Sequence, residues 1–364
     1  MRFNGIVPYI LKNIGDIAGS NDPQKKITSP GFLRMLLDYS PNIQYPEIHD
    51  GECRDLRIRY MPRGCDNVID APVCEGIISP SWKEQTIPEL LYRGVSMVIP
   101  YDLLCKLERE AMQPESFGTP AAEGWKILWA FMQTNINDLL TQIDKTLLLE
   151  QAAKWGVNVA YTPANNTPKN IIFGKTQGMT DGIVRLITDA QTNEISGRFP
   201  IVGNGAVNNF MVWNNMKSGT DLLGFGSQDF SIYNDVHSTS VWGANHFGVF
   251  EPGYIGLIHV NQYGNIVRGQ FGDTFYFRIP IQIDGGKTIW FDAMMKKDGC
   301  PMPTIHLVIS LNYALWNMPS EVFNTCDRLS GYNGSLHYVG VNEDCIRVCT
   351  SGSSEPEVEP EEKP

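Results

Sequence analysis

The sequence has no continuous apolar run long enough to cross a membrane, which takes about eighteen residues. Its opening stretch, MRFNGIVPYILKNIG, also lacks the unbroken apolar core of a signal peptide. We therefore expect a protein kept in the cytosol unless another device releases it. None of the eight cysteines forms a CxxC pair, and no histidine follows at zinc-finger spacing. Free thiols are expected, and a disulfide between Cys65 and Cys74, which bracket one short excursion, is the less favoured alternative.

Charged residues are scarce as well, at 19% of the chain against the usual ~25%. The formal net charge of −11 argues against a nucleic-acid-binding surface over the whole molecule, but it does not exclude a local basic patch. Apolar residues make up 42%, which is enough to bury real cores and excludes wholesale disorder. Uncharged polar groups and glycine must cover much of the surface, as in proteins that pack against other subunits.

The strongest pattern predicts one long helix over Glu123–Trp155, because apolar residues recur there at i, i+3, i+4 and i+7. After Trp125 no proline or glycine interrupts it, and Gly156 supplies a stop. At ~1.5 Å per residue the rod is roughly 45–50 Å long, which suits the beam of an extended domain. Its apolar stripe consists of Trp125, Leu128, Trp129, Met132, Ile136, Leu139, Leu140, Ile143 and Leu147.

Two segments ahead of this helix lack cores of their own. Residues 1–50 carry only short apolar pieces, and residues 53–105 alternate with a period near two, which predicts an antiparallel ribbon. Two or three strands without a covering helix bury too little to stand alone. A hairpin packed on its own domain is one interpretation. We favour the other, in which arm and ribbon find their buried partners on other copies of the chain.

The segments follow the order arm, β-excursion, long helix, inserted α/β lobe and closing strands. This order resembles that of the Hong-Kong-97-type major capsid proteins of tailed double-stranded DNA bacteriophages, and the likeness covers residues 40–345. Five stretches are similar to sequences of such proteins: QIDKTLLLEQA (Gln142–Ala152), FPIVGNG (Phe199–Gly205), FEPGYIGLIHVN (Phe250–Asn261), DAMMKKDGC (Asp292–Cys300) and NYALWNMPSEVF (Asn312–Phe323).

The resemblance implies an α+β, Hong-Kong-97-like capsid fold with an inserted axial domain. Its divisions would be an N-terminal arm (1–52), an extended β-hairpin loop (53–105), a peripheral domain (106–160 and 286–349) with its spine helix (123–155), an axial domain (161–285) and a disordered acidic tail (350–364).

The same resemblance implies a structural protein without catalytic activity, cofactor or metal. It would be a major capsid subunit that assembles in the host cytoplasm into hexamers and pentamers of an icosahedral virion shell around double-stranded DNA. Expected partners are other copies of the chain, a separate scaffolding protein, a portal and decoration proteins, with no membrane. Contact with packaged DNA would be non-specific and would involve three lysines of the arm, Lys12, Lys25 and Lys26. A role in surface solubility explains these lysines equally well.

Charged side chains of the ribbon are the candidate subunit-interface residues, although a solvated strand face explains them as well. They are Arg57, Arg59, Arg63, Glu75, Lys83, Glu84 and Glu89. Some relatives also weld their subunits by a Lys–Asn isopeptide bond. Lys83 with Asn317 or Asn324 would offer the two residues, but nothing fixes a glutamate beside them, so we do not predict cross-linking.

Two other classes stay open. One is the shell of a cellular nanocompartment, encapsulin-like, with the same fold. The other is a cytosolic enzyme that uses the GNGAVNN turn (Gly203–Asn209), which lacks the third glycine of a dinucleotide loop. An enzyme would alternatively use His237 and His246 with Asp235 and Glu251, whose spacing matches no zinc pattern.

Overall fold

The computed structural model describes residues 3–18, 27–40, 43–44, 56–61, 82–87, 89–112, 123–160, 168–173, 186–195, 198–205, 230–260, 269–283, 287–298, 304–320 and 331–342. The Cys65–Cys74 excursion and the acidic tail lie outside the described residues. The described part combines helices with three β-sheets, so the predicted α+β class is confirmed. Among its helices none is long and apolar enough to cross a membrane. By its internal contacts the chain divides into two units, Met1–Lys154 with Pro252–Val322 and Trp155–Glu251 with Phe323–Pro364.

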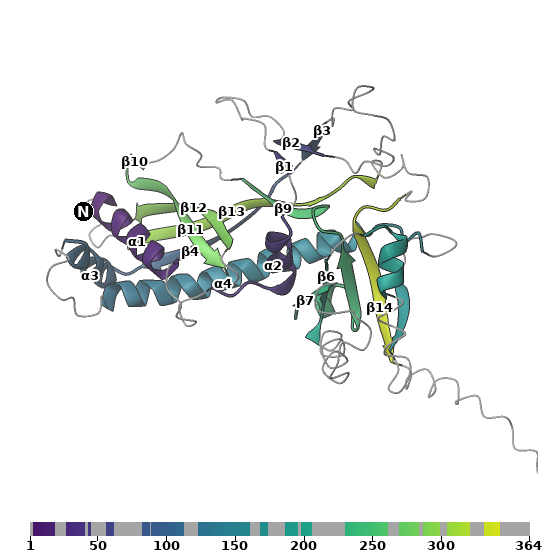
Figure 1. The fold of residues 1–364 in the computed structure, drawn as a ribbon. Coiled ribbons are helices and arrows are strands. Elements are labelled where there is room, and N and C mark those ends of the chain that lie inside the picture. Colours follow the sequence, from purple (N-terminus) through teal and green to yellow (C-terminus); the bar gives the residue numbers. More distant parts are fainter. Residues whose placement is uncertain are drawn as a thin grey trace, which may run out of the picture. The chain divides into compact units, whose positions relative to one another are not determined.

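The first unit is built on a six-stranded sheet with the order β10-β11-β12-β13-β4, in which β9 also pairs with β13 (Figure 1). Its described pairings are antiparallel. In the register of β4 with β13, the buried Ile99 and Met97 lie opposite Ile305 and Leu307. The strands are β4 (Leu91–Ile99), β9 (Ile255–Val260), β10 (Gly269–Phe271), β11 (Thr274–Ile283), β12 (Lys287–Asp298) and β13 (Thr304–Asn317).

Helix α4 (Glu123–Ala152) runs along one face of this sheet and packs on β4 and β13 (Figure 1). Every residue of the predicted apolar stripe is buried, so the helix and its inward face are confirmed. It ends at Ala152, short of the predicted Trp155. The last turn tightens there, because the N–H groups of Ala153 and Lys154 bond to carbonyls three residues back.

A carboxylate from helix α3 (Tyr101–Met112) caps the start of α4. Glu110 accepts hydrogen bonds from the backbone N–H of Gly124 (2.7 Å) and of Trp125 (3.1 Å). These donors belong to the first helical turn, which has no carbonyl partner inside the helix and favours negative charge. The hydroxyl of Tyr9, in helix α1 (Phe3–Ala18), donates to the same carboxylate at 3.1 Å. Glu110 therefore joins three helices.

A second carboxylate, on α4 itself, caps helix α2 (Gly31–Asp38). Asp144 is fully buried, and its Oδ1 accepts the backbone N–H of Leu33 at 2.9 Å. No side chain of the residue that precedes α2, Pro30, caps the helix. A buried polar group is costly unless it is hydrogen-bonded, so Asp144 fixes α2 to one place on α4.

These contacts correct the expectation that the arm finds its buried partners on other copies. Helix α1 buries Ile6, Val7, Ile10 and Ile14 within the chain, where it packs on β11 and α3. Further along the arm α2 packs on α4 and β9, and an isolated bridge joins Ile27 to Ile283. The arm has enough apolar residues for two amphipathic helices, and its own chain provides the surface that covers them.

The ribbon is a three-stranded antiparallel sheet of β1 (Ile43–Gln44), β2 (Leu56–Tyr60) and β3 (Lys83–Ile87). The predicted alternation holds in β2, where Ile58 and Tyr60 are buried and Arg57 and Arg59 are exposed. Tyr60 packs on Trp316 of β13 with ring centroids 5.7 Å apart, and the Trp316 indole N–H donates to Gln85 at 2.8 Å. The described part of the ribbon therefore packs on its own chain, contrary to expectation, and β4 leaves it to join the main sheet.

The second unit holds a five-stranded mixed sheet with the order β5-β14-β8-β6-β7. The pairs β5–β14 and β6–β7 are parallel, and the two pairs between β14, β8 and β6 are antiparallel. Residues 186–192 are helical, and α7 (Ser238–Val241) is a single turn. Its strands are β5 (Lys169–Phe173), β6 (Phe199–Gly203), β7 (Phe230–Asn234), β8 (His246–Phe250) and β14 (Ser335–Asn342).

The predicted domain boundaries at 160/161 and 285/286 differ from this division. Strands β9 to β11, placed in the inserted lobe from the sequence, belong to the sheet of the first unit, because β9 pairs with β13 and β11 with β12. Strand β14, placed with the closing strands, pairs with β5 and β8 of the second unit. Periodicity locates strands, and it carries no information about their distant partners.

We expect the Asp144→Ala substitution to lower the free energy of unfolding of the unassembled subunit by about 1–3 kcal/mol, because it leaves the buried Leu33 N–H without its acceptor. Asp144→Asn should lose less, since an amide oxygen still accepts. The exposed Asp138→Ala on the same helix is the control and should stay within about 0.5 kcal/mol. Urea unfolding measures all three, and equal losses at Asp144 and Asp138 would contradict the capping role.

A pH dependence follows from the Tyr9 hydroxyl. Burial first, and then the charge of Glu110 and the hydrogen bond to it, raise the pKa of Tyr9 to about 12 from its usual 10.0. Since the folded pKa lies above the unfolded one, this contribution is fully present below pH 10 and is lost as the pH rises through 12. Wild type should therefore be more stable than Tyr9→Phe at pH 8, and this advantage should vanish by pH 12. Tyr92→Phe, at an exposed position, controls for the loss of a hydroxyl. An advantage that does not change with pH would contradict the Glu110 bond.

Candidate subunit interface

The charged ribbon residues predicted as interface lie partly within the described structure. Arg57, Lys83, Glu84 and Glu89 are exposed. Arg59 pairs across the strands with Glu84, its Nε lying 2.7 Å from Oε1, and both side chains are about half exposed. Arg63 and Glu75 lie outside the described residues. A half-exposed pair adds little to the stability of one subunit, so these charges are free to serve a contact with another.

Two large apolar side chains mark the end of the described ribbon. Met61 and Trp82 directly follow and precede the last cross-strand pair, Tyr60 with Lys83, so the two are neighbours at this ribbon end. They are 41% and 39% exposed. Exposed tryptophans are candidates for a contact with a partner, because tryptophan is among the residues enriched at binding hot spots.

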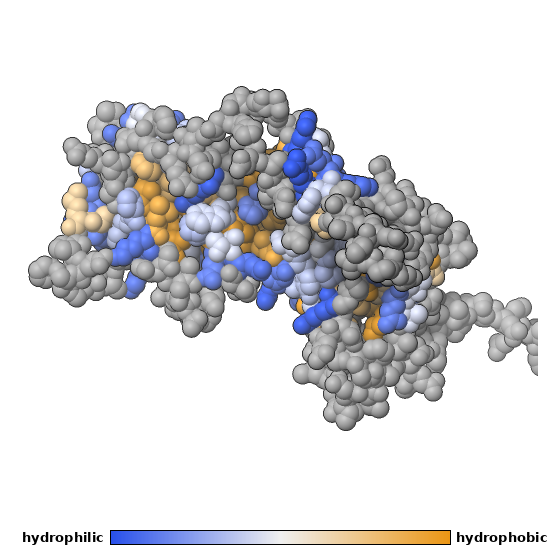
Figure 2. Space-filling view, turned by 45° about the horizontal axis from the view of Figure 1, so that its top comes forward, coloured by the Kyte–Doolittle hydropathy of each residue, from blue (hydrophilic) through white to orange (hydrophobic). Residues whose placement is uncertain are grey.

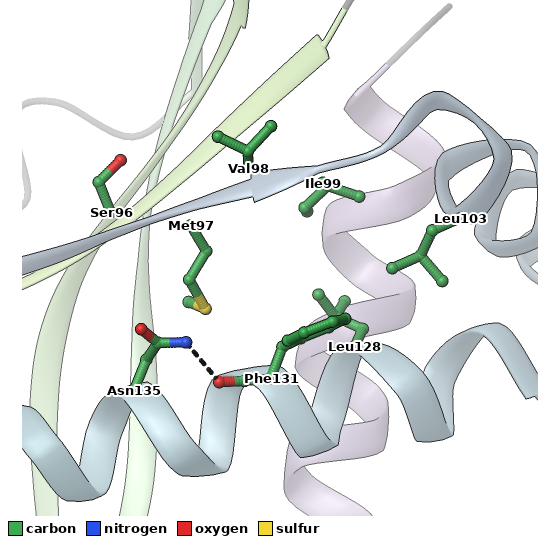
Figure 3. Close-up of a pocket in the computed structure, with 8 residues that line it drawn as sticks. All are labelled: Ser96, Met97, Val98, Ile99, Leu103, Leu128, Phe131 and Asn135. Atoms are coloured by element: carbon green, nitrogen blue, oxygen red, sulfur yellow. Dashed lines mark hydrogen bonds between the residues drawn. The ribbon is translucent and has the colours of Figure 1, made fainter.

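The second apolar surface is a cavity of about 220 Å³ between β4 and α4 (Figure 3). Met97 and Ile99 point from the strand toward the helix, whereas Val98 points away from it, and Leu128 and Phe131 line the helix side. This volume is smaller than a usual ligand site of about 300–1,000 Å³ and suits one large side chain. The lining is completed by Ser96, Leu103 and Asn135.

Exposed apolar groups continue around the cavity. Phe131 is 54% exposed and Val98 is 55% exposed. On the sheet face turned away from α4, Tyr92 and Trp290 are exposed as well, and Figure 2 shows apolar residues reaching the surface in patches between hydrophilic ones. Among the described strands none pairs with the outer edge of β4, which leaves a row of backbone donors and acceptors beside the cavity.

Sequence reasoning missed this surface, although one signal pointed to it. Phe131 lies off the apolar stripe of α4, on the side where polar residues dominate, and an apolar residue there has no core to join. The cavity itself depends on the crossing of β4 over α4, which no local pattern encodes.

The residues proposed for cross-linking are not brought together by any described contact. Asn317 donates from Nδ2 to Gln151 of α4 at 3.0 Å, which gives it a structural role within its own chain. Lys83 is exposed on the ribbon, and Asn324 lies outside the described residues.

The residues proposed for an enzyme site make structural hydrogen bonds instead. Asp235 accepts the N–H groups of His237 (2.8 Å) and Ser238 (3.2 Å) and so caps the α7 turn. Glu251 accepts the hydroxyl of Tyr332 at 3.0 Å. Within the described residues no three His, Cys, Asp or Glu side chains come together as metal ligands would. Gly203 ends β6, and its carbonyl accepts the N–H of Asp235 at 2.8 Å.

His246 instead meets His337, and no sequence pattern connects the two residues. His246 Nδ1 lies 3.0 Å from His337 Nε2. Strands β8 and β14 bring them together across a long separation in sequence, and a single histidine carries no periodic signal that would reveal it.

No family model matches the chain, and no curated protein matches it. Three solved structures show what it is similar to. The cyanophage A-1(L) capsid asymmetric unit has 12% identity and a TM-score of 0.46, with 77% of this chain and 87% of that one covered. The capsid of cyanophage P-SCSP1u has 11% identity and a TM-score of 0.38, covering 80% and 85%. The capsid of Staphylococcus phage Andhra has 6% identity and a TM-score of 0.38, covering 88% and 87%. All three are structures of phage capsids.

We expect the double substitution Arg59→Ala with Glu84→Ala to change the unfolding free energy of the unassembled subunit by less than about 1 kcal/mol, because the pair is half exposed. The same variant should assemble less well than wild type, by sizing at low salt, where charge contacts between subunits are least screened. Arg57→Ala, at an exposed position on the same strand, is the single-charge comparison. Assembly equal to wild type would remove this pair from the interface.

Proposed function

We propose that the protein is a major capsid subunit, which self-assembles into the hexamers and pentamers of an icosahedral shell around viral double-stranded DNA. The observation that carries this proposal is that one chain has two exposed apolar surfaces, a ribbon end and a cavity. The ribbon end presents Met61 and Trp82, and the cavity between β4 and α4 offers room for one large side chain. The similar structures are phage capsids as well, and the proposal does not depend on them.

When a projecting side chain and the pocket that accepts it lie at different places on the subunit, each copy binds the next head to tail. Such contacts close into rings when the rotation between neighbours permits it, and capsomers are rings of this kind. In the proposed contact, Trp82 of one copy enters the cavity of the next, where Met97, Leu128 and Phe131 line it. The charges at Arg59 and Glu84 would lie at the rim, where they favour the correct partner more than they add affinity.

The geometry disfavours the simplest alternative, a two-fold dimer in which β4 pairs with β4 of a second copy. Paired strands lie about 4.8 Å apart, whereas helices need 8–10 Å between their axes. Because α4 packs directly on β4, two such layers would collide. The edge of β4 therefore suits an incoming extended segment that brings no helix of its own.

The other partners follow from the proposed role. A separate scaffolding protein, a portal and decoration proteins would act in the host cytoplasm during assembly, and the finished protein would lie in the virion capsid. Contact with DNA would be non-specific, and Lys12 in helix α1 is the one described lysine of the arm. The role is structural and not catalytic.

Sizing and negative-stain images of the purified chain test the proposal. Wild type should form ring-shaped capsomers or megadalton shells. Trp82→Ala and Phe131→Glu should stay as small species with an unchanged unfolding midpoint, since both side chains are exposed in the single chain. Trp290→Ala, at a similarly exposed tryptophan of β12, is the matched control and should assemble normally.

Wild type that remains a monomer or small oligomer at high concentration would contradict the shell role. Assembly of Trp82→Ala equal to wild type would refute the ribbon contact and leave the shell role standing. Shells that enclose a protein cargo and no nucleic acid when isolated from their source would favour the nanocompartment.

A further inference from the structure

The second unit contains a histidine pair that has no part in the proposed assembly. His246 lies at the start of β8 and His337 within β14, at diagonal positions of an antiparallel pairing in which His337 is opposite Gly248 and Val339 opposite His246. His246 Nδ1 and His337 Nε2 are 3.0 Å apart. The two strands fix the backbone under both rings.

The surroundings hold each ring in place. The ring of His337 stacks on the indole of Trp155, with centroids 4.5 Å apart and planes 13° from parallel. Trp155 reaches it over Gly248, where a Cβ would lie 2.7 Å from the indole and 2.6 Å from Phe250. His246 lies against Gly243, where a Cβ would approach the imidazole to 2.9 Å and where φ is +114°. Both positions require glycine, so the two rings are positioned by backbone and not by chance.

Both imidazoles are neutral near pH 7. Burial, and then the charge of His246, lower the pKa of His337 to about 4 from the usual 6.5. Burial also lowers the pKa of His246. Neutral imidazoles have a free lone pair, which is what a metal ligand needs.

We propose that His246 and His337 bind one divalent transition cation through the two nitrogens that face each other. Two metal–nitrogen bonds of about 2.1 Å that meet at a right angle place their nitrogens about 3.0 Å apart, which is the distance observed. Right angles belong to the tetragonal sites of Cu²⁺ and Ni²⁺, whereas tetrahedral Zn²⁺ spreads its ligands further. Since no third His, Cys, Asp or Glu joins the pair within the described residues, water fills the other positions.

The competing account is a plain hydrogen bond between the two rings, which the same distance allows. The accounts differ in what happens on adding a metal. Copper and nickel ions quench tryptophan fluorescence at short range, and Trp155 in contact with His337 is a built-in reporter. Binding to the folded state alone also raises the unfolding midpoint.

The experiment titrates CuCl₂, NiCl₂ and ZnCl₂ separately into the purified full chain while recording tryptophan fluorescence and the thermal midpoint. We expect saturable 1:1 quenching, reversed by EDTA, and a raised midpoint, with copper tightest and zinc weakest. His246→Gln, at a partly buried position, should fold and lose the saturable component. His337→Gln should lose it as well. His237→Gln, in the same unit and outside the pair, should keep it.

Absence of saturable quenching in wild type, or equal quenching in His246→Gln and wild type, would overturn the site and leave the hydrogen bond as the role of the pair. Retention of binding in both pair variants with loss in His237→Gln would also overturn it. None of these outcomes touches the shell role, because ring or shell formation is scored separately by sizing.

Discussion

The structure of the first unit depends on two carboxylates that hold helix ends against the long helix. Glu110 satisfies the unpaired donors at the start of α4 and also takes the hydroxyl of Tyr9, and Asp144 reaches from the buried side of α4 to the start of α2. Asp144 is fully buried and Glu110 is partly buried, and burying such a polar group is favourable only when its hydrogen bonds are made. The arm must therefore lie where these acceptors are, and it lies on its own chain.

This constraint decides which surfaces are left for other copies. With α1 and α2 seated and Tyr60 of the ribbon packed on Trp316, the exposed apolar groups of the described residues include those at the ribbon end and around the cavity beside β4. Assembly then needs no unfolding of the arm and adds contacts to a subunit that is already folded. Many protein interfaces form in this way, with little change in the backbone of either partner on binding.

The long helix and the strand faces could be predicted from the sequence, because periodicity marks them directly. Met132 and Ile136 are buried as the spacing requires, and Arg57 and Arg59 are exposed. What periodicity does not carry is pairing at a distance. It placed β9 in the inserted lobe and β14 with the closing strands, and it gave no sign that Asp144 would meet Leu33 or His246 would meet His337. The expectation that the arm needs a neighbour failed for the same reason. Short amphipathic pieces show that a partner is required, and they do not say whether the same chain provides it.

Amide hydrogen exchange, compared between dissociated subunits and assembled particles, tests the central claim most directly. The amides of α1 and α2, Leu33 among them, should be protected in both states. Those of the outer edge of β4 and of the ribbon next to Trp82 should gain protection only on assembly. Protection of the arm that appears only in particles, or a β4 edge already protected in the single subunit, would contradict this account.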